Sequence, residues 1–266
     1  MSANELDRTD AEQEVAHLRA ANEALEAELW ATRIEPTRWV TARCVEEFGL
    51  TVRAGPFAGL RFPDQLAKGV DALVAKLLGA YERELHLAID ELIATAPETL
   101  VNVGCAEGFY AVGFARRSPS TTVLAYDANE GKRADCALLA EANGVADRVT
   151  IGGRCDPPQL AGLEPGACVI LDCEGCELEL IGDAAMPGLR RATILVELHD
   201  GVDQAVTGTV LRRLEATHDA ELITSEPRNI DDFPELSFLG WNNRQIAIWE
   251  FRPRPMRWAI LRPRPA

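Results

Sequence analysis

The chain has 266 residues and a formal net charge of −15. This length accommodates one α/β domain with small additions better than two complete domains. So acidic a surface repels phosphate backbones, and no apolar run approaches the ~20 residues of a membrane span, so we expect neither a nucleic-acid partner nor a membrane partner. The acidic start lacks the features of a signal peptide, which predicts a cytoplasmic protein.

Residues 10–33 carry a heptad pattern. Val15, Leu18, Asn22, Leu25 and Leu29 occupy alternating a and d positions. An asparagine at an a position fixes the register of a parallel two-stranded coil, so this segment predicts a homodimer. The run is shorter than three heptads, and a single amphipathic helix is an open alternative. We assign residues 1–35 to this N-terminal helix.

Residues 36–98 form the next predicted unit, a hairpin followed by a helical lid. Residues 50–63 alternate in polarity and contain Gly55, Pro56 and Gly59, a pattern typical of a small hairpin. Residues 64–95 have helical apolar spacing and are expected to break near Gly79. Helices in this position, ahead of a first strand, are expected to cover a ligand crevice.

Residues 99–251 alternate between strand and helix patterns, which predicts a doubly wound α/β sheet. Two further strands, joined by a long connection over residues 226–243, would complete seven. The expected strands cover residues 99–104, 121–126, 148–152, 167–172, 192–198, 221–225 and 244–251. The expected helices cover residues 108–117, 130–143, 175–183 and 203–217.

Residues 252–266 are rich in arginine and proline and contain no acid. Proline at this density excludes a helix and favours an extended chain. We interpret this tail as a strap across the acidic domain, anchored by Met256, Trp258, Ile260 and Leu261. A contact for an anionic substrate or partner is the alternative.

The seven cysteines are scattered through the sequence, which favours a reducing compartment over a disulfide framework. Cys105, Cys155 and Cys173 each follow a predicted strand and would lie along one rim of the sheet. Cys173 and Cys176 form a C-x-x-C pair, but the second pair or the histidines of a zinc site are missing from the sequence. We therefore interpret these thiols as small hydrophobes in tight turns.

The first predicted strand leads into a glycine turn, Gly104-x-x-x-Gly108, and the second strand ends at Asp127. An acid at that strand end can accept both hydroxyls of an adenosine ribose. The turn lacks the G-x-G-x-x-G of dinucleotide sites, and Glu107 inside it would repel a pyrophosphate. S-adenosylmethionine carries cationic groups and no phosphate, so the pattern favours this cofactor over NAD. Glycines that serve packing alone are the structural alternative.

Three segments resemble class I S-adenosylmethionine-dependent methyltransferases, and within them the FkbM-like group: N-V-G-C-A-E-G-F-Y at residues 102–110, L-D-C-E-G-C-E at residues 171–177 and V-E-L-H at residues 196–199. The family has an acid where Asn102 stands, so a charge near the methionine ammonium is lost. The resemblance implies a Rossmann-like, seven-stranded methyltransferase sheet. It also implies that the cofactor is bound by Asn102, Gly104, Cys105, Ala106, Glu107, Gly108, Tyr110, Asp127, Ala128, Cys155 and Asp172.

Acidic side chains follow the fourth and fifth predicted strands, where a parallel sheet binds its ligands. The candidate catalytic residues are Asp172, Glu174, Glu197 and His199. Asp172, Glu197 and Asp200 would suit a hard divalent cation such as magnesium. Alternatively, His199 or Glu197 would be a metal-free general base, and helix capping is a third interpretation.

The sequence thus predicts a small-molecule methyltransferase, and the resemblance suggests the hydroxyl of a sugar or glycoside as acceptor. N-methylation is a second hypothesis, although no N/D-P-P-Y-like segment follows the fourth strand. A non-catalytic protein that binds S-adenosylmethionine or S-adenosylhomocysteine, or that serves as a scaffold, is a third. The polar cluster at the strand ends argues against a degenerate site.

Overall fold

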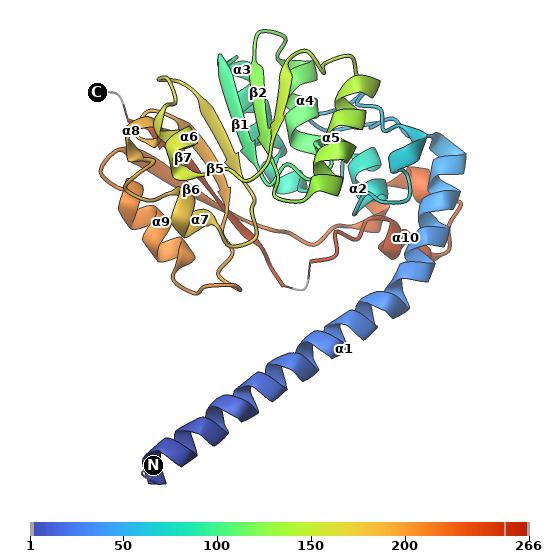
Figure 1. The fold of residues 1–266 in the computed structure, drawn as a ribbon. Coiled ribbons are helices and arrows are strands. Elements are labelled where there is room, and N and C mark those ends of the chain that lie inside the picture. The colour runs from blue at the N-terminus through green and yellow to red at the C-terminus, as the bar shows by residue number, and fades with distance from the viewer. Residues whose placement is uncertain (1–2, 253, 265–266) are drawn as a thin grey trace.

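The computed structural model describes residues 3–252 and 254–264 (Figure 1). These residues form a seven-stranded sheet in the order β3-β2-β1-β4-β5-β7-β6, in which β1 to β5 are parallel and β7 runs antiparallel to both of its neighbours. The strands are β1 (Thr99–Val103), β2 (Thr122–Tyr126), β3 (Val149–Gly152), β4 (Cys168–Leu171), β5 (Thr193–Glu197), β6 (His218–Thr224) and β7 (Arg257–Pro263). The predicted seven-stranded, doubly wound α/β sheet is confirmed.

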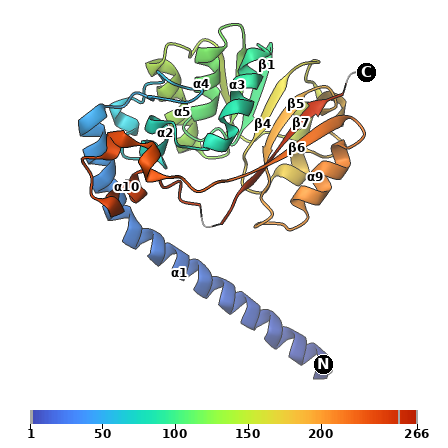
Figure 2. The ribbon, with the colours of Figure 1, turned by 180° about the vertical axis from the view of Figure 1, so that it is seen from behind.

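Helices cover both faces of the sheet because its strands are apolar on both faces (Figures 1 and 2). Leu100 and Ile170 belong to one core, and their neighbours Val101 and Val169 belong to the other. The first core is covered by α3 (His86–Ala94), α4 (Phe109–Arg117) and α5 (Glu130–Ala142). The second is covered by α6 (Pro157–Ala161), α7 (Glu177–Leu180), α8 (Met186–Leu189) and α9 (Val206–Leu214).

The seventh strand lies in the arginine-rich tail, and the prediction of a strand over residues 244–251 is wrong. That region begins as helix α10 (Trp241–Ala247), whose Ala247 is buried in a separate apolar cluster. In β7, Trp258 and Ile260 face one core while Ala259 and Leu261 face the other. The tail is therefore an internal strand of the sheet, not a strap across its surface.

Helix α1 (Ala3–Phe48) continues well beyond residue 35, and its N-terminal part extends away from the sheet (Figures 1 and 2). Its C-terminal part docks on the domain because Val40 and Cys44 are buried against α2 (Leu73–Leu78) and α10. Val15, Leu18 and Leu25 are 48%, 58% and 56% exposed. The side chain of Leu29 lies outside those that the structure describes.

The lid between α1 and β1 is less regular than predicted. The expected hairpin is reduced to one antiparallel bridge between Thr51 and Arg61. The helical part breaks at Gly79 as predicted, where φ is +70° and α2 ends. Between α2 and α3 lies the short helix η2 (Arg83–Leu85), next to the turn at Tyr81 and Glu82. The other short helix of the lid is η1 (Asp64–Leu66).

The long connection between β6 and β7 leaves the sheet and crosses to the end of α1 before it returns (Figure 1, orange to red). It includes the short helices η3 (Ile230–Asp232) and η4 (Pro234–Leu236) as well as α10. Its Arg228 forms buried ion pairs with Glu84 of the lid and with Glu250 of the connection itself. The connection and the lid therefore meet at the carboxyl ends of the strands. In the part of the chain that is described, no helix combines the length and apolarity of a membrane span.

Candidate active site

The glycine turn after β1 is packed so tightly that side chains are excluded. Gly104 has φ +78°, and a Cβ there would lie 1.6 Å from the carbonyl oxygen of Asp172. Gly108 has φ +92°, and a Cβ there would lie 2.7 Å from Sγ of Cys136. Both positions therefore require glycine, for conformation and for space. The turn is pressed directly against the end of β4.

Asp127 links the end of β2 to this turn. Its Oδ2 accepts a hydrogen bond from the backbone N–H of Ala106 at 2.9 Å, and its Oδ1 accepts one from Asn129 N–H at 2.8 Å. A carboxylate has about four acceptor sites, so about two remain for further donors. Asp127 is partly exposed, and the neighbouring Ala128 is exposed. The arrangement can hold a vicinal diol.

Asn102 offers a buried acceptor at the same edge. It is 2% exposed, and its Oδ1 has no hydrogen-bond partner among the described residues. Buried polar atoms are normally paired, so an unpaired oxygen beside a tight glycine turn indicates a donor that binds there. An ammonium or amine N–H has the right chemistry.

Glu107 was expected to bind the cofactor, but in the structure its carboxylate faces the lid. It is buried, and its carboxylate pairs with Lys76 of α2 at 2.5 Å. The Lys76 ammonium also lies 4.8 Å from the ring centre of Tyr81. The Glu107 carboxylate, which we expected at the cofactor, thus joins the lid to the glycine turn. The hydroxyl of Tyr110 is likewise engaged by the lid and donates to Glu82.

Two of the three candidate rim cysteines, Cys105 and Cys155, are buried. Cys105 lies in the core on one face of the sheet and Cys155 in the core on the other. Burial raises the pKa of the Cys155 thiol to about 11, with a further contribution from Asp156. Both residues can line a cofactor crevice only through backbone or apolar contact.

A cavity of about 480 Å³ opens at the carboxyl ends of β4 and β5, and the returning connection lines one side of it. Its wall includes Tyr81, Glu82, Asp172, Glu174, Glu197, His199, Glu250 and Arg252. Asp172 contributes its carbonyl to the contact with Gly104 and its side chain to the cavity. The cavity thus begins where the glycine turn packs against the end of β4.

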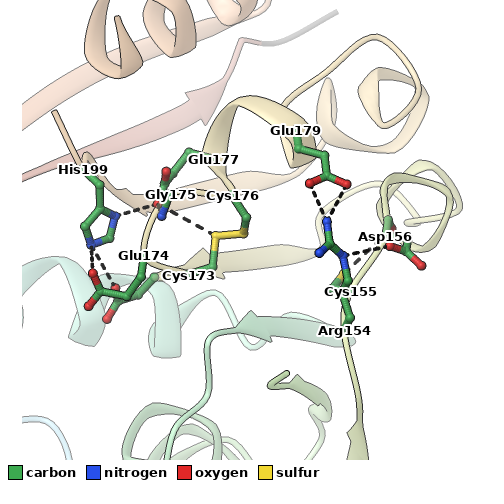
Figure 3. The surroundings of a disulfide bond; sticks show 11 residues. Arg154, Cys155, Asp156, Cys173, Glu174, Gly175, Cys176, Glu177, Glu179 and His199 are labelled. Carbon is green, nitrogen blue, oxygen red and sulfur yellow. Dashed lines mark hydrogen bonds and ion pairs between the residues drawn. A yellow bond between two sulfur atoms is a disulfide. The ribbon is translucent and has the colours of Figure 1, made fainter. Parts of the chain in front are cut away.

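His199 lies at the centre of the acidic group (Figure 3). It is 5% exposed, and its Nδ1 lies 2.6 Å from Oε1 of Glu177, which is fully buried. Its Nε2 lies 3.4 Å from a carboxylate oxygen of Glu174, 3.7 Å from one of Asp172 and 3.8 Å from one of Glu197. The imidazole therefore bridges a buried acid and the acids of the cavity.

These contacts shift the pKa of three groups. Burial and the nearby Glu82 raise the pKa of Asp172 to about 7, against the opposing effect of His199. Burial and the charges of Asp172 and Glu82 raise the pKa of Glu197 to about 9. Burial alone would lower the pKa of His199, but its bond to Glu177 and the charges of Glu197 and Asp172 raise it to about 9. Both shifts favour the protonated forms of His199 and Glu197 at neutral pH.

In the candidate metal site of the structure, His199 takes the place of Asp200 from the predicted set. Donor atoms of Asp172, Glu197 and His199 lie within 4.8 Å of one another. Asp200 is not part of this group, because its carboxylate accepts bonds from Thr207 and pairs with Arg257. These partners lower the pKa of Asp200 although its partial burial would raise it. Two carboxylates and an imidazole fit one divalent cation.

Four residues of the site are not among those predicted from the sequence. Glu177 holds His199, Glu82 lies at the lid, Arg252 binds Glu82 at 2.7 Å, and Trp258 donates its indole N–H to Glu197 at 3.2 Å. Glu177 stood in a segment of the family resemblance, residues 171–177, which was the available signal. Arg252 and Trp258 were assigned to the tail, and only the position of β7 brings them to the site.

The C-x-x-C pair was predicted as free thiols, but a disulfide joins Cys173 to Cys176 (Figure 3). The prediction was wrong because a C-x-x-C can close when a tight turn brings its two Cβ atoms together. Here the turn contains Glu174 at φ +55° and Gly175 at φ +113°. The disulfide thus lies between two acids of the site, Asp172 and Glu177.

No protein-family model and no curated protein matches the sequence. Among solved structures, the chain is similar to TomG, an O-methyltransferase from Streptomyces achromogenes in complex with SAM, with 16% identity, 66% of this chain and 78% of that chain covered, and a TM-score of 0.45. An O-methyltransferase from Bacillus cereus with SAH has 12% identity and a TM-score of 0.44, with 66% of this chain and 79% of that chain covered. An rRNA methylase from Streptococcus thermophilus has 14% identity and a TM-score of 0.46, with 68% of this chain and 98% of that chain covered. The function of this chain has to be read from its own residues.

Proposed function

We propose that this protein is an S-adenosylmethionine-dependent methyltransferase. The observation that carries the proposal is the junction of two sites at one sheet edge: the glycine turn with Asp127, and the acidic cavity that starts at Asp172. Ligands of parallel α/β sheets bind at this edge. A glycine turn without the pyrophosphate-binding pattern, next to a polar cavity, suits a methyl donor and its acceptor.

The residues present fit the cofactor. Asp127 has acceptor sites left for ribose hydroxyls, and Asn102 has an unpaired oxygen for the methionine ammonium. Gly104 lets the backbone approach closely. When bound, S-adenosylmethionine supplies an electrophilic methyl group. The protein has to align the acceptor with that group and exclude water.

The proposed acceptor is a hydroxyl of a small molecule, of the sugar or glycoside class, as in the FkbM-like group that the motifs resemble. The cavity volume of about 480 Å³ is in the range of small-molecule sites. Its many carboxylates can accept hydrogen bonds from several hydroxyls. The wall residues Tyr81 and Met256 add apolar surface for the face of a ring.

Asp172 is the group that we propose takes the hydroxyl proton. Its side chain lines the cavity, lies 3.7 Å from Nε2 of His199 and has a raised pKa of about 7, close to the ideal for a base at neutral pH. His199 and Glu197 carry protons at that pH and are therefore poorer bases. Glu197 orients the acceptor, and the cationic His199 compensates the charge on Asp172.

A divalent cation held by Asp172, Glu197 and His199 is the alternative for the same step. It would lower the pKa of a bound hydroxyl and compensate the carboxylates. The imidazole among the donors favours manganese, iron or zinc more than magnesium. This set replaces the one predicted from the sequence.

We also propose that the chain forms a homodimer through α1. The N-terminal part of α1 extends away from the sheet (Figure 2). Val15, Leu18 and Leu25 in this half of the helix are exposed. Isolated long helices gain little from propensity alone, and a partner would cover these side chains. We also propose a cytoplasmic location, because five of the seven cysteines are free thiols and the one disulfide, Cys173–Cys176, lies in a partly exposed loop that a dithiol can reduce.

The direct test is methyl transfer from S-adenosylmethionine labelled in its methyl group to a panel of sugars, glycosides and amines. The proposal expects label in a hydroxylated acceptor and its loss in Asp172→Asn. Label in amines only would support the N-methylation hypothesis instead. Binding of S-adenosylhomocysteine without transfer to any class would support a non-catalytic protein.

A further inference from the structure

The loop between β4 and α7 places a disulfide inside the acidic site. Cys173 and Cys176 are joined, and they alternate in sequence with Asp172, Glu174 and Glu177. Both cysteines are partly buried, while Glu174 between them is exposed, so a thiol reagent can reach the bond. The other five cysteines are buried free thiols. Redox chemistry is therefore directed to this one loop.

One carboxylate oxygen connects the disulfide to His199 (Figure 3). Oε1 of Glu177 lies 3.8 Å from Sγ of Cys173 and 2.6 Å from Nδ1 of His199, and it accepts the N–H of Gly175 at 3.2 Å. The other oxygen, Oε2, has no partner among the described residues. Any movement of the loop therefore reaches the imidazole through Glu177.

The loop that the disulfide closes has an unfavourable backbone conformation at Glu174. Glu174 has φ +55° and Gly175 has φ +113°, in the left-handed region that residues other than glycine rarely adopt. In this shape the carboxylate of Glu174 lies 3.4 Å from Nε2 of His199. If the disulfide were reduced, the loop would be free to leave this backbone conformation. Glu174 would then move away from His199.

We propose that the Cys173–Cys176 disulfide is a redox switch of the methyl-transfer site, opened by a dithiol reductant. This proposal rests on the proposed function for its effect on turnover, but not for its effect on His199. We infer that the disulfide-bonded form is the one in which the site is aligned for transfer, because it holds Glu174 and Glu177 next to the two nitrogens of the His199 imidazole.

The step is thiol–disulfide exchange. A thiolate of the dithiol attacks one sulfur, the S–S bond breaks, and a mixed disulfide forms. The second thiol of the reductant displaces the protein sulfur and closes its own disulfide. The protein gains two electrons and two protons as two cysteine thiols, and the reductant loses the same number.

Reduction changes the surroundings of Glu177 in a second way. In the disulfide, Sγ of Cys173 carries no proton and only contacts Oε1. As a thiol it becomes a donor toward the same oxygen, in competition with His199. Loop opening and this new donor both weaken the hold of Glu177 on Nδ1.

The test reads His199 directly. The ring ¹⁵N shifts of the full-length protein are measured before and after reduction with dithiothreitol, with the His199 signals identified by their loss in His199→Gln. Alkylation followed by mass spectrometry shows whether Cys173 and Cys176 have been reduced. We expect the Nδ1 signal of His199 to shift while those of His86 and His218 stay unchanged. An unchanged His199 signal in protein that is alkylated at both cysteines would overturn the proposal.

Turnover provides the second readout. Misalignment costs up to about 100-fold in rate, and we expect reduction to lower turnover by about 10-fold to 100-fold and reoxidation to restore it. The variant Cys173→Ala/Cys176→Ala should have the low rate and no response to dithiothreitol. A wild-type rate in the reduced protein would contradict the switch. Absence of methyl transfer in every form would instead contradict the proposed function, and the ¹⁵N shifts would still decide the switch.

Discussion

The carboxylate of Asp127 accepts the backbone N–H of Ala106 at 2.9 Å and so joins the end of β2 to the glycine turn after β1. The same carboxylate accepts Asn129 N–H at the start of α5. One side chain thus fixes two loops and still has acceptor sites free. The proposed ribose site is built around it.

Asp127→Ala should weaken binding of S-adenosylhomocysteine by ~1.5–3 kcal/mol, because a hydrogen bond to a charged group is lost. Isothermal titration calorimetry measures this change. Asp147→Ala is the matched control, since Asp147 is exposed in the turn before β3. Equal affinity of the Asp127 variant and the wild type would remove Asp127 from the cofactor site.

Deletion of residues 1–33 should convert a dimer into a monomer while cofactor affinity stays unchanged. The deletion removes the exposed Val15, Leu18 and Leu25 but keeps Val40 and Cys44, which anchor α1 on the domain. Light scattering measures the molar mass of both forms. A full-length protein that is already monomeric would contradict the proposed coil.

Asp172→Asn should lower turnover by roughly 10²–10⁴-fold, the usual contribution of a general base, with affinity for S-adenosylhomocysteine retained. The rate of the wild type should rise with pH through about 7, as Asp172 loses its proton. Activity should survive EDTA. Loss of activity in EDTA with recovery in manganese or magnesium would favour the cation held by Asp172, Glu197 and His199.

The ligand-free protein should become less stable as the pH rises from about 5 to about 9. The folded pKa values of Asp172 and Glu197, about 7 and about 9, lie above their ordinary values of 3.8 and 4.5, so the folded state binds more protons in this window. His199 acts in the same direction, because its stabilisation is complete below 6.5 and is lost as the pH rises through about 9.

Thermal unfolding at several pH values measures this trend. Glu197→Gln should flatten it, since glutamine does not titrate and keeps an oxygen for the indole N–H of Trp258. A melting temperature that rises between pH 6 and pH 9 would show that these carboxyls are not protonated in the fold.

The sequence was sufficient for the parallel part of the sheet, where strong local signals agree. The strand at residues 99–103 is apolar and ends in Gly104, and the next strand ends in Asp127. The strand at residues 257–263 was missed because arginines and prolines surround its apolar residues. It is a strand because β5 and β6 pair with it on both sides, which is information that no local window contains.

The candidate site was predicted in the same uneven way. Glu197 and His199 are two residues apart at the end of β5, a spacing that puts both side chains on one face, whereas Asp200 begins the following turn. This periodicity favours His199 over Asp200 and was available in the sequence. The contact between Glu82 and Arg252 could not be predicted from the sequence, because about 170 residues of chain separate the two side chains.

Calorimetric titration of the wild-type protein with S-adenosylhomocysteine, repeated in the presence of NAD, tests the central claim most directly. The account predicts saturable one-to-one binding of S-adenosylhomocysteine, with NAD unable to compete. Asp127, Asn102 and Gly104 provide for a ribose and an ammonium but not for a pyrophosphate. Absence of binding by folded protein, or displacement by NAD, would contradict the methyltransferase assignment.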